Sequence, residues 1–429
     1  MQYFSTADKS LKADFRQATI QGQPLDKGLY FPERIPQLPK GFIETLNSLS
    51  KEEIAFQVIK PYVGDSLDDA TLQTIVTETV FFDFPLVKIH DDISALELFH
   101  GPTLAFKDVG ARFMSRCLSH FAKDEKRKVT VLVATSGDTG GAVADAFYGV
   151  ENVDVVILYP SGKVSDIQER QLTTLGENIT ALEVEGSFDD CQRMVKEAFA
   201  NKDLNERLYL TSANSINVAR WLPQQFYYFF AQQQWQAEIA PVVCVPSGNF
   251  GNICAGLLAH SSGLPVAHFI AACNANDVVP RYLSSGQYET KPTAFTLSNA
   301  MDVGAPSNFV RILQIFNNHL PSLKNVLSSY SIADEETVQA IKEVKEEHNY
   351  LLDPHGAVGY VALQRYLNKH AAQKGYLLET AHPVKFNTEE FTGHKVDIPR
   401  SIEHLLKKEK KSIVMKAEEK ELKEFLLSS

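Results

Sequence analysis

One lysine has a setting in which it could do chemistry. The stretch from Glu97 to Asp108, ELFHGPTLAFKD, places Lys107 after a His-Gly-Pro turn and a Leu-Ala-Phe run. We expect the apolar run to turn inward, which puts Lys107 at the edge of a buried site where desolvation favours the neutral amine. A neutral amine can form an imine with a carbonyl cofactor. A lysine beside an apolar run can equally extend its ammonium to solvent, so this stretch alone leaves both interpretations open.

A glycine-rich loop, SGNFGN at 247–252, has the features of a phosphate site. It follows an apolar strand pattern and precedes a helix pattern. Glycines let backbone N–H groups converge, and the helix N-terminus adds partial positive charge. The loop has neither the Gly-Lys-Ser/Thr of a P-loop nor the GxGxxG spacing of a dinucleotide site. The alternative is a tight turn without a ligand.

A second loop, SGDTGG at 136–141, lies in a similar context. Ser136 and Thr139 offer hydroxyls, and we expect Gly137 and Gly140 to expose backbone donors. Such a loop suits a carboxylate or a phenolate ligand, although the pattern is weak in isolation.

Two further stretches could complete a site. The segment SANSINVAR, 212–220, leads from small amides and hydroxyls to Arg220, whose forked donors suit a phosphate. A helix cap with a surface arginine is the alternative. Thr380 follows the apolar strand pattern GYLLE, where its hydroxyl could bond a ring nitrogen. For His382, a structural, hydrogen-bonded role is favoured over a catalytic one.

The bulk composition narrows the function classes. The 429-residue chain carries 42 basic and 53 acidic residues, a net charge of −11. This charge argues against a nucleic-acid surface, which needs a basic field. It also means that an anionic substrate needs a local positive pocket. No apolar run reaches membrane-spanning length and the N-terminus has no apolar signal core, so we expect a cytoplasmic protein without nucleic-acid or membrane partners.

The cysteines are scattered, without CxxC pairs or histidine-rich spacing, and we expect buried reduced thiols and no metal site. They are Cys117, Cys191, Cys244, Cys254 and Cys273.

Alternating strand and helix patterns must position these loops. Strand-loop-helix units are predicted at 128–149 and 241–263, and further buried strands at 153–160, 179–186 and 266–274. This alternation indicates an α/β fold with parallel sheets flanked by helices, in two lobes with the active cleft between them. Near the N-terminus, Ser66 is predicted to cap a helix that runs to Val80, with Asp68 and Asp69 in its first turn.

We divide the chain into four parts. These are an N-terminal region (1–95), a smaller α/β lobe with the lysine and the 136–141 loop (96–230), a larger lobe with the 247–252 loop (231–400) and a charged helical tail (401–429). In the tail, Leu405, Leu406, Leu422, Phe425 and Leu426 are expected to dock an amphipathic helix on the surface.

Six motifs in order resemble the threonine synthase family, a pyridoxal-phosphate-dependent group of the tryptophan-synthase-β-like fold type II. They are HGPTLAFKD, ATSGDTGGAV, SANSIN with Arg220, VPSGNFGN, TLSNAMDVGAPSN and TAHPVKF, and the resemblance runs from about residue 28 to 386. It implies a cofactor in the interlobe cleft and conversion of O-phospho-L-homoserine and water into L-threonine and phosphate. A monomer or a homodimer is expected.

The resemblance also implies roles for single residues. Lys107 resembles the lysine that holds the cofactor as an imine and is the catalytic residue. Asp138 stands where other branches place an Asn beside the cofactor 3′-hydroxyl, and Thr380 resembles the residue that faces the pyridine nitrogen. The cofactor phosphate loop corresponds to Gly248, Asn249, Phe250, Gly251 and Asn252, with Asn252 where some relatives carry Asp.

The remaining matches concern the substrate. Asn214, Ser215 and Arg220 resemble the substrate-phosphate site, and Ser136 and Thr139 the substrate-carboxylate side.

Four alternatives remain at this level. A phospho-lyase of the same fold would give 2-oxobutyrate from the same substrate. A serine or threonine dehydratase has no need of a second anion pocket, a non-catalytic binding module has no need of Lys107, and a nicotinamide dehydrogenase lacks its dinucleotide spacing here.

Overall fold

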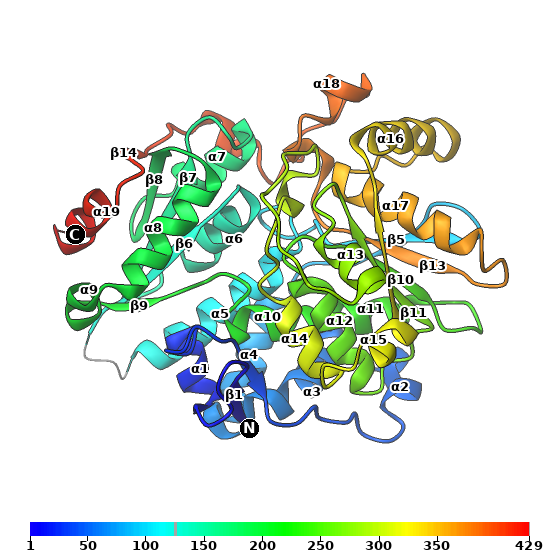
Figure 1. The fold of residues 1–429 in the computed structure, drawn as a ribbon, viewed down its shortest axis with the longest axis horizontal. Coiled ribbons are helices and arrows are strands. Elements are labelled where there is room, and N and C mark those ends of the chain that lie inside the picture. The colour runs from blue at the N-terminus through cyan, green and yellow to red at the C-terminus, as the bar shows by residue number, and fades with distance from the viewer. Residues whose placement is uncertain (124–126, 429) are drawn as a thin grey trace.

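Runs of valine, isoleucine and leucine form a five-stranded parallel sheet in the order β14-β8-β7-β6-β9. Its strands are β6 (Val129–Ala134), β7 (Val153–Pro160), β8 (Ile179–Glu185), β9 (Tyr209–Thr211) and β14 (Ile413–Lys416). All residues of β6 are buried, as a strand covered on both faces requires. The sheet lies on one side of the molecule in the computed structural model, which describes residues 1–123 and 127–428 (Figure 1).

Helices follow these strands in turn, as the sequence predicted. They are α5 (Lys107–Ala122), α6 (Asp138–Phe147), α7 (Asp166–Thr173), α8 (Phe188–Ala200), α9 (Lys202–Arg207), α10 (Val218–Trp221) and α11 (Phe226–Gln234). Helices α6 and α8 begin directly after strand ends, so their N-termini and the preceding loops gather at the carboxyl edge of the sheet.

A second sheet has six strands in the order β12-β11-β10-β13-β5-β4. All neighbours are parallel except β4 and β5. Its strands are β4 (Leu86–Lys88), β5 (Ile93–Glu97), β10 (Val242–Pro246), β11 (His268–Cys273), β12 (Leu327–Ser331) and β13 (Gly375–Glu379). Its helices are α12 (Gly251–Ser261), α13 (Val278–Ser285), α14 (Phe309–Ile315), α15 (Leu320–Val326), α16 (Asp334–His348), α17 (Pro354–Leu367) and α18 (Thr388–Thr392).

The N-terminal region packs beneath both lobes (Figure 1). It holds a small antiparallel sheet and four helices, namely β1 (Gln2–Ser5), β2 (Lys12–Asp14), β3 (Tyr30–Pro32), α1 (Phe15–Gln21), α2 (Phe42–Thr45), α3 (Lys51–Val63) and α4 (Asp69–Thr79). The predicted cap was wrong by two residues. Asp68, not Ser66, caps α4, because its carboxylate accepts from both the N–H and the hydroxyl of Thr71.

The C-terminal tail joins the smaller lobe. It contributes the edge strand β14 as well as a helix, α19 (Glu419–Ser428). Leu405, Leu422 and Leu426 are buried, whereas Leu406 is exposed. Sheet membership also places β5 with the larger sheet. The four-part division at 95, 230 and 400 stays a prediction.

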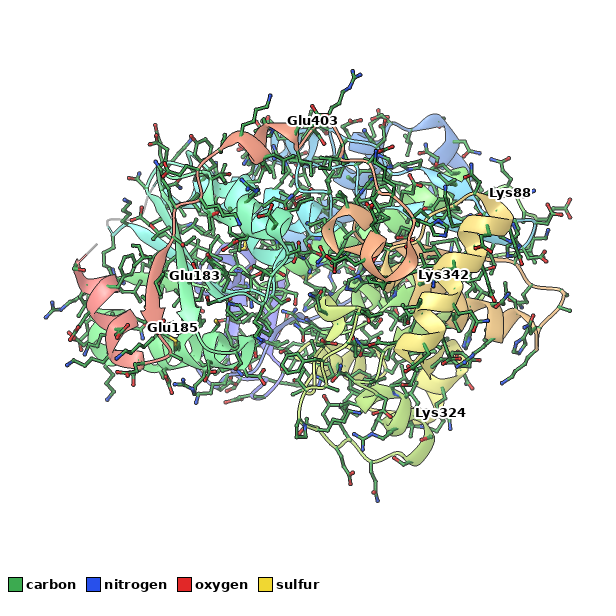
Figure 2. All side chains as sticks on the ribbon, turned by 90° about the horizontal axis from the view of Figure 1, so that it is seen from above. Lys88, Glu183, Glu185, Lys324, Lys342 and Glu403 are labelled. Carbon is green, nitrogen blue, oxygen red and sulfur yellow. The ribbon has the colours of Figure 1, made fainter. Side chains whose placement is uncertain are left out.

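Figure 2 shows many side chains reaching outward from the ribbon, Lys88 and Glu403 among those labelled. The five cysteines are free and buried, which confirms the sequence-based prediction. Among the described residues, no helix is both long and apolar enough to cross a membrane.

Candidate active site

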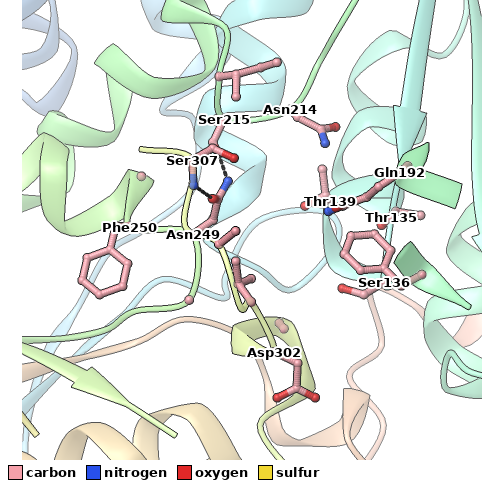
Figure 3. A pocket seen from close by; sticks show the side chains of 18 of the residues that line it. Thr135, Ser136, Thr139, Gln192, Asn214, Ser215, Asn249, Phe250, Asp302 and Ser307 are labelled. Carbon is pink, nitrogen blue, oxygen red and sulfur yellow. Dashed lines mark hydrogen bonds between the residues drawn. The ribbon is translucent and has the colours of Figure 1, made fainter. Parts of the chain in front are cut away.

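A cavity of about 1220 Å³ opens where the carboxyl ends of β6, β10 and β13 meet. Every site residue predicted from the sequence lines it: Lys107, Ser136, Asp138, Thr139, Asn214, Ser215, Arg220, Gly248, Asn249, Phe250, Gly251, Asn252 and Thr380. Figure 3 shows Ser215 and Asn249 on one wall and Ser136 and Thr139 on the other. The structure therefore brings the separate motifs together, while their individual roles stay predictions.

Backbone pairing places Lys107 beside the end of β13. Ala105 and Ala381 form an isolated antiparallel bridge. Phe106 donates its N–H to the carbonyl of Thr380 at 2.9 Å, and His382 donates to the carbonyl of Leu104 at 3.1 Å. Of the apolar run that was expected to turn inward, Leu104 and Ala105 are buried, whereas Phe106 is half-buried and lines the cavity. Helix α5 begins with Lys107 at the cavity wall.

The amine of Lys107 is largely buried and has two other cations nearby, Lys385 and Arg220. Its Nζ is 3.8 Å from Oδ2 of Asp138, and its side chain is 15% exposed. Burial, with Lys385 and Arg220 nearby, lowers the pKa of Lys107 to about 8, although Asp138 opposes this change. The expected shift towards a neutral amine is therefore present.

The 247–252 loop forms an anion cradle. Gly248 must lack a side chain, because a Cβ there would lie 2.5 Å from Cα of Met301. Phe250 adopts a left-handed conformation with φ of 61°. Among the described residues, the N–H groups of Gly248, Asn249 and Phe250 have no hydrogen-bond partner. Three unpaired N–H groups ahead of α12 fit a phosphate.

Side chains around this loop hold its shape. The amides of Asn249 and Asn308 both donate to Oγ of Ser215, at 3.0 and 2.9 Å. Since this oxygen already accepts twice, the Ser215 hydroxyl proton is left to donate into the cavity. Oδ1 of Asn252 accepts from Tyr227 and Tyr228, both at 2.7 Å, and its buried Nδ2 has no partner.

Arg220 is buried beside Lys107 without a carboxylate partner in the described part of the chain. Nη1 donates to the carbonyl of Lys107 at 3.3 Å, and the buried Nε has no partner. Burial lowers the pKa of Arg220 to about 10, although Asp108 opposes this change. Close packing of α10 on α5 requires Gly110, whose Cβ would lie 2.4 Å from the Arg220 carbonyl oxygen.

The 136–141 loop corrects one expectation. The N–H groups of Gly137 and Gly140 are not exposed donors, because both bond to Oγ1 of the buried Thr135, at 2.9 and 2.8 Å. The residues of this loop that line the cavity are Ser136, Asp138 and Thr139.

Thr380 and His382 differ in setting. Thr380 lines the cavity. His382 instead accepts from the N–H of Val384 with its Nδ1, at 3.2 Å, and caps the turn Pro383–Lys385. The structural interpretation of His382 is thus consistent with its contacts.

The sequence analysis did not identify two buried charged residues near the site. Lys385 is fully buried and binds Oδ1 of Asp138 at 2.8 Å. Arg311 is fully buried and donates to the carbonyls of Ser215, at 2.9 Å, and Ile216, at 2.5 Å, which fixes the segment before Arg220. The signal for Lys385 was present, since it is the one lysine in TAHPVKF.

Comparison with known proteins decides the family. A model of pyridoxal-phosphate-dependent enzymes matches residues 86–378, and models of the threonine synthase N terminus and of its C-terminal part match 2–80 and 356–426. The threonine synthase of Escherichia coli is 44% identical over 94% of each chain. That of Haemophilus influenzae is 45% identical over 94% of each. The chain belongs to the threonine synthase family.

Solved structures agree with this membership. The crystal structure of threonine synthase from Escherichia coli covers all of both chains with a TM-score of 0.93 and 42% identity. The PLP-bound threonine synthase from Brucella melitensis has a TM-score of 0.92 and 35% identity. The tomato threonine deaminase isoform 2 shares only the fold, with a TM-score of 0.58 and 16% identity.

Membership confirms several predictions for this threonine synthase family member. The fold is the fold type II α/β architecture, the cofactor is pyridoxal phosphate, and the chain is a lyase of threonine biosynthesis rather than a dehydratase or a dehydrogenase. The unpaired donors of the 247–252 loop fit the cofactor phosphate. Among the described residues, no group of acidic, histidine and cysteine side chains could hold a metal ion.

Proposed function

We propose that the chain converts O-phospho-L-homoserine and water into L-threonine and inorganic phosphate. Arg220 carries the proposal. It is a buried cation without a carboxylate partner among the described residues, in the same cavity as the Lys107 amine and the 247–252 cradle. A second anion pocket is what a phosphorylated substrate needs and a dehydratase substrate does not.

Three groups would hold the cofactor. Lys107 would attach its carbonyl carbon, the N–H groups of Gly248 to Asn252 would bind its phosphate, and Asp138 and Thr380 would face its ring. Pyridoxal phosphate, when bound, supplies the electron sink that stabilises negative charge at the substrate carbons.

The opposite walls of the cavity would bind the substrate. Ser136 and Thr139 present hydroxyls for its carboxylate, and Asn214, Ser215 and Arg220 surround its phosphate. The free proton of the Ser215 hydroxyl and the unpaired Nε of Arg220 both suit phosphate oxygens.

In this arrangement Lys107 is the base. Freed as a neutral amine when the substrate amine takes its place, its Nζ removes the Cα proton. A Cβ proton is lost as phosphate leaves Cγ. A proton then adds at Cγ, the hydroxyl of water adds at Cβ, a proton returns to Cα, and the remaining proton of water goes to the phosphate. Arg220 and Ser215 stabilise the charge on the departing phosphate. The buried walls around Lys107 restrict water until its addition at Cβ.

Product identification tests the proposal. The purified chain is incubated with pyridoxal phosphate and O-phospho-L-homoserine. Threonine and phosphate in equal amounts are expected. Release of 2-oxobutyrate with phosphate would assign a phospho-lyase, and no turnover would refute the proposal.

We also propose that the protein acts in the cytoplasm as a monomer or a homodimer. Five free, buried cysteines support a reducing compartment. Size-exclusion chromatography with light scattering tests the assembly state, and cell fractionation tests the location.

A further inference from the structure

Among the described residues, a buried lysine outside the predicted site has one carboxylate partner, which it shares with Lys107. Nζ of Lys385 lies 2.8 Å from Oδ1 of Asp138 and 2.7 Å from the carbonyl oxygen of Thr103, and the side chain is fully buried. Oδ2 of the same Asp138 faces Lys107 at 3.8 Å. Asp138 therefore stands between two lysines and is much closer to Lys385.

The surroundings fix this arrangement. Nε2 of Gln168 donates to Oδ1 of Asp138 at 3.0 Å, so the carboxylate cannot turn freely towards Lys107. Lys385 is held from the other side by the Thr103 carbonyl, which also accepts from Gln171 at 3.0 Å. Lys385 and Lys107 thus compete for one carboxylate from fixed positions.

The charges of this region balance only when Lys107 is neutral. The charged groups near Lys107 are Asp138 on α6, Lys385 on the turn after β13 and Arg220 on α10. Asp108 accepts from the N–H of Thr103, whose carbonyl oxygen accepts from Lys385, so Asp108 and Lys385 are neighbours. The two negative charges of Asp138 and Asp108 equal the two positive charges of Lys385 and Arg220, so the region has no net charge while Lys107 is neutral. A charged Lys107 would leave a buried positive charge, which is costly without a partner.

The titration behaviour agrees with this geometry. Lys385 and Lys107 hold the pKa of Asp138 well below its usual range, although burial alone would raise it. Burial raises the pKa of Asp108 to about 6, so it is still ionised at neutral pH. Asp138 is therefore an anion whose charge is already neutralised by its nearer neighbour, Lys385.

We propose that Lys385 is a positioning residue that neutralises Asp138 and thereby keeps Lys107 as the neutral amine that reacts with the cofactor carbonyl. The inference rests on the proposed function of Lys107. Lys385 itself touches neither cofactor nor substrate in this proposal, since its amine is fully enclosed. It acts through the charge of Asp138.

Opposite shifts in paired variants test this role. In the full-length chain, Lys107 is trace-labelled with acetic anhydride across pH, and its reaction is followed by peptide mass spectrometry. Lys385→Met should free Asp138 for Lys107 and move the labelling profile up by about one pH unit or more. Asp138→Asn should move it down by a similar amount. The double variant should return close to the wild-type profile.

Controls separate charge from structure. Lys385→Arg keeps the charge and should leave the profile close to wild type, whereas Lys385→Gln repeats the loss of charge if the Met variant does not fold. Lys374→Met removes an exposed, ion-paired lysine outside the cavity lining and should cause no shift. In the loaded enzyme, the acidic limb of the kcat profile should move in the same directions, because the Lys107 amine is free only after the substrate amine has taken its place.

Either of two results would overturn the inference. The first is a Lys385→Met or Lys385→Gln profile that stays in place, and the second is a shift in the same direction as that of Asp138→Asn. A lower melting temperature of the Lys385 variants without a shift of the Lys107 labelling profile would mean that Lys385 only stabilises the fold. If Lys107→Ala still takes up the cofactor and turns over substrate, the proposed function fails instead, and the two failures are thus distinguishable.

Discussion

Replacing Arg220 with Met should stabilise the cofactor-free chain and disable the enzyme. Met keeps an unbranched apolar stem but removes the buried charge. Arg220 is 3% exposed, and among the described residues its guanidinium donates one hydrogen bond, at 3.3 Å, while its Nε has no partner. A buried cation without a carboxylate is unfavourable in the empty site, and apolar replacements of such charges are often neutral or stabilising.

The structure gives the size of this effect. Burial lowers the pKa of Arg220 from its ordinary value to about 10, a change of more than two pKa units. At about 1.4 kcal/mol per pKa unit, the charge costs the folded chain about 3 kcal/mol. Loss of the bond to the Lys107 carbonyl costs about 1 kcal/mol. The free energy of unfolding should therefore rise by about 2 kcal/mol in Arg220→Met.

Activity should change in the opposite sense. If Arg220 stabilises the departing phosphate, kcat/KM should fall about 10²- to 10³-fold, as when one preorganised donor is removed from a charged transition state. Inorganic phosphate should raise the melting temperature of the wild type by mass action. The rise should be smaller in the variant, because only the 247–252 cradle is left there to bind phosphate.

Urea unfolding of both chains without cofactor, with and without phosphate, measures the stabilities. Arg207→Met is the matched control, because Arg207 is an exposed arginine paired with Asp203 on the same helix. It should change stability by less than about 1 kcal/mol. If Arg220→Met loses stability as well as activity, Arg220 is a structural residue and the argument from its unpaired charge is wrong.

Three further predictions follow from the cavity walls. The folded pKa of Lys107, about 8, lies below its ordinary 10.5, so the unfolded chain binds the extra proton between these values. Urea midpoints should show wild-type stability rising with pH through this window by about 3 kcal/mol relative to Lys107→Met, and a parallel course would contradict the lowered pKa. Gly248→Ala should weaken cofactor binding by about tenfold or more in equilibrium dialysis, because its Cβ would strike Met301, and wild-type affinity would argue against the cradle. Ser215→Ala should lower kcat/KM about 10- to 100-fold and cost about 1–2 kcal/mol, since two amides lose their acceptor, and an unchanged kcat/KM would remove Ser215 from the substrate wall.

Much of the fold could be predicted because its signals are local. The apolar run of β6 and the glycines before α12 each lie within about ten residues, so pattern alone located the strand, the loop and the helix. The cavity-lining residues came from motif resemblance, and Lys107 from the apolar run before it. For these elements the prediction and the structure agree.

What could not be predicted depends on which of several possible donors, acceptors and strands pair in the folded chain, both nearby and far along the sequence. Thr135 takes the N–H groups of Gly137 and Gly140, which changes what that loop can offer a ligand. Strand β14 pairs with β8 across more than two hundred residues, and no periodicity in a charge-dense tail reveals such a partner. Asp68, rather than Ser66, caps α4 because its carboxylate accepts hydrogen bonds from both the N–H and the hydroxyl of Thr71.

An acidic protein that binds anions must concentrate positive charge in its binding site. This chain does so with buried positive groups in the cavity that have no anionic partner there. The net charge of −11 repels a phosphorylated substrate at long range. Within the cavity, however, Arg220 has no carboxylate within ion-pair distance among the described residues, and the 247–252 loop has unpaired N–H groups. Both features are unfavourable in the empty site and are relieved by a bound anion. Part of the binding free energy is therefore stored as instability of the empty site, which is why Arg220→Met should gain stability at the expense of function.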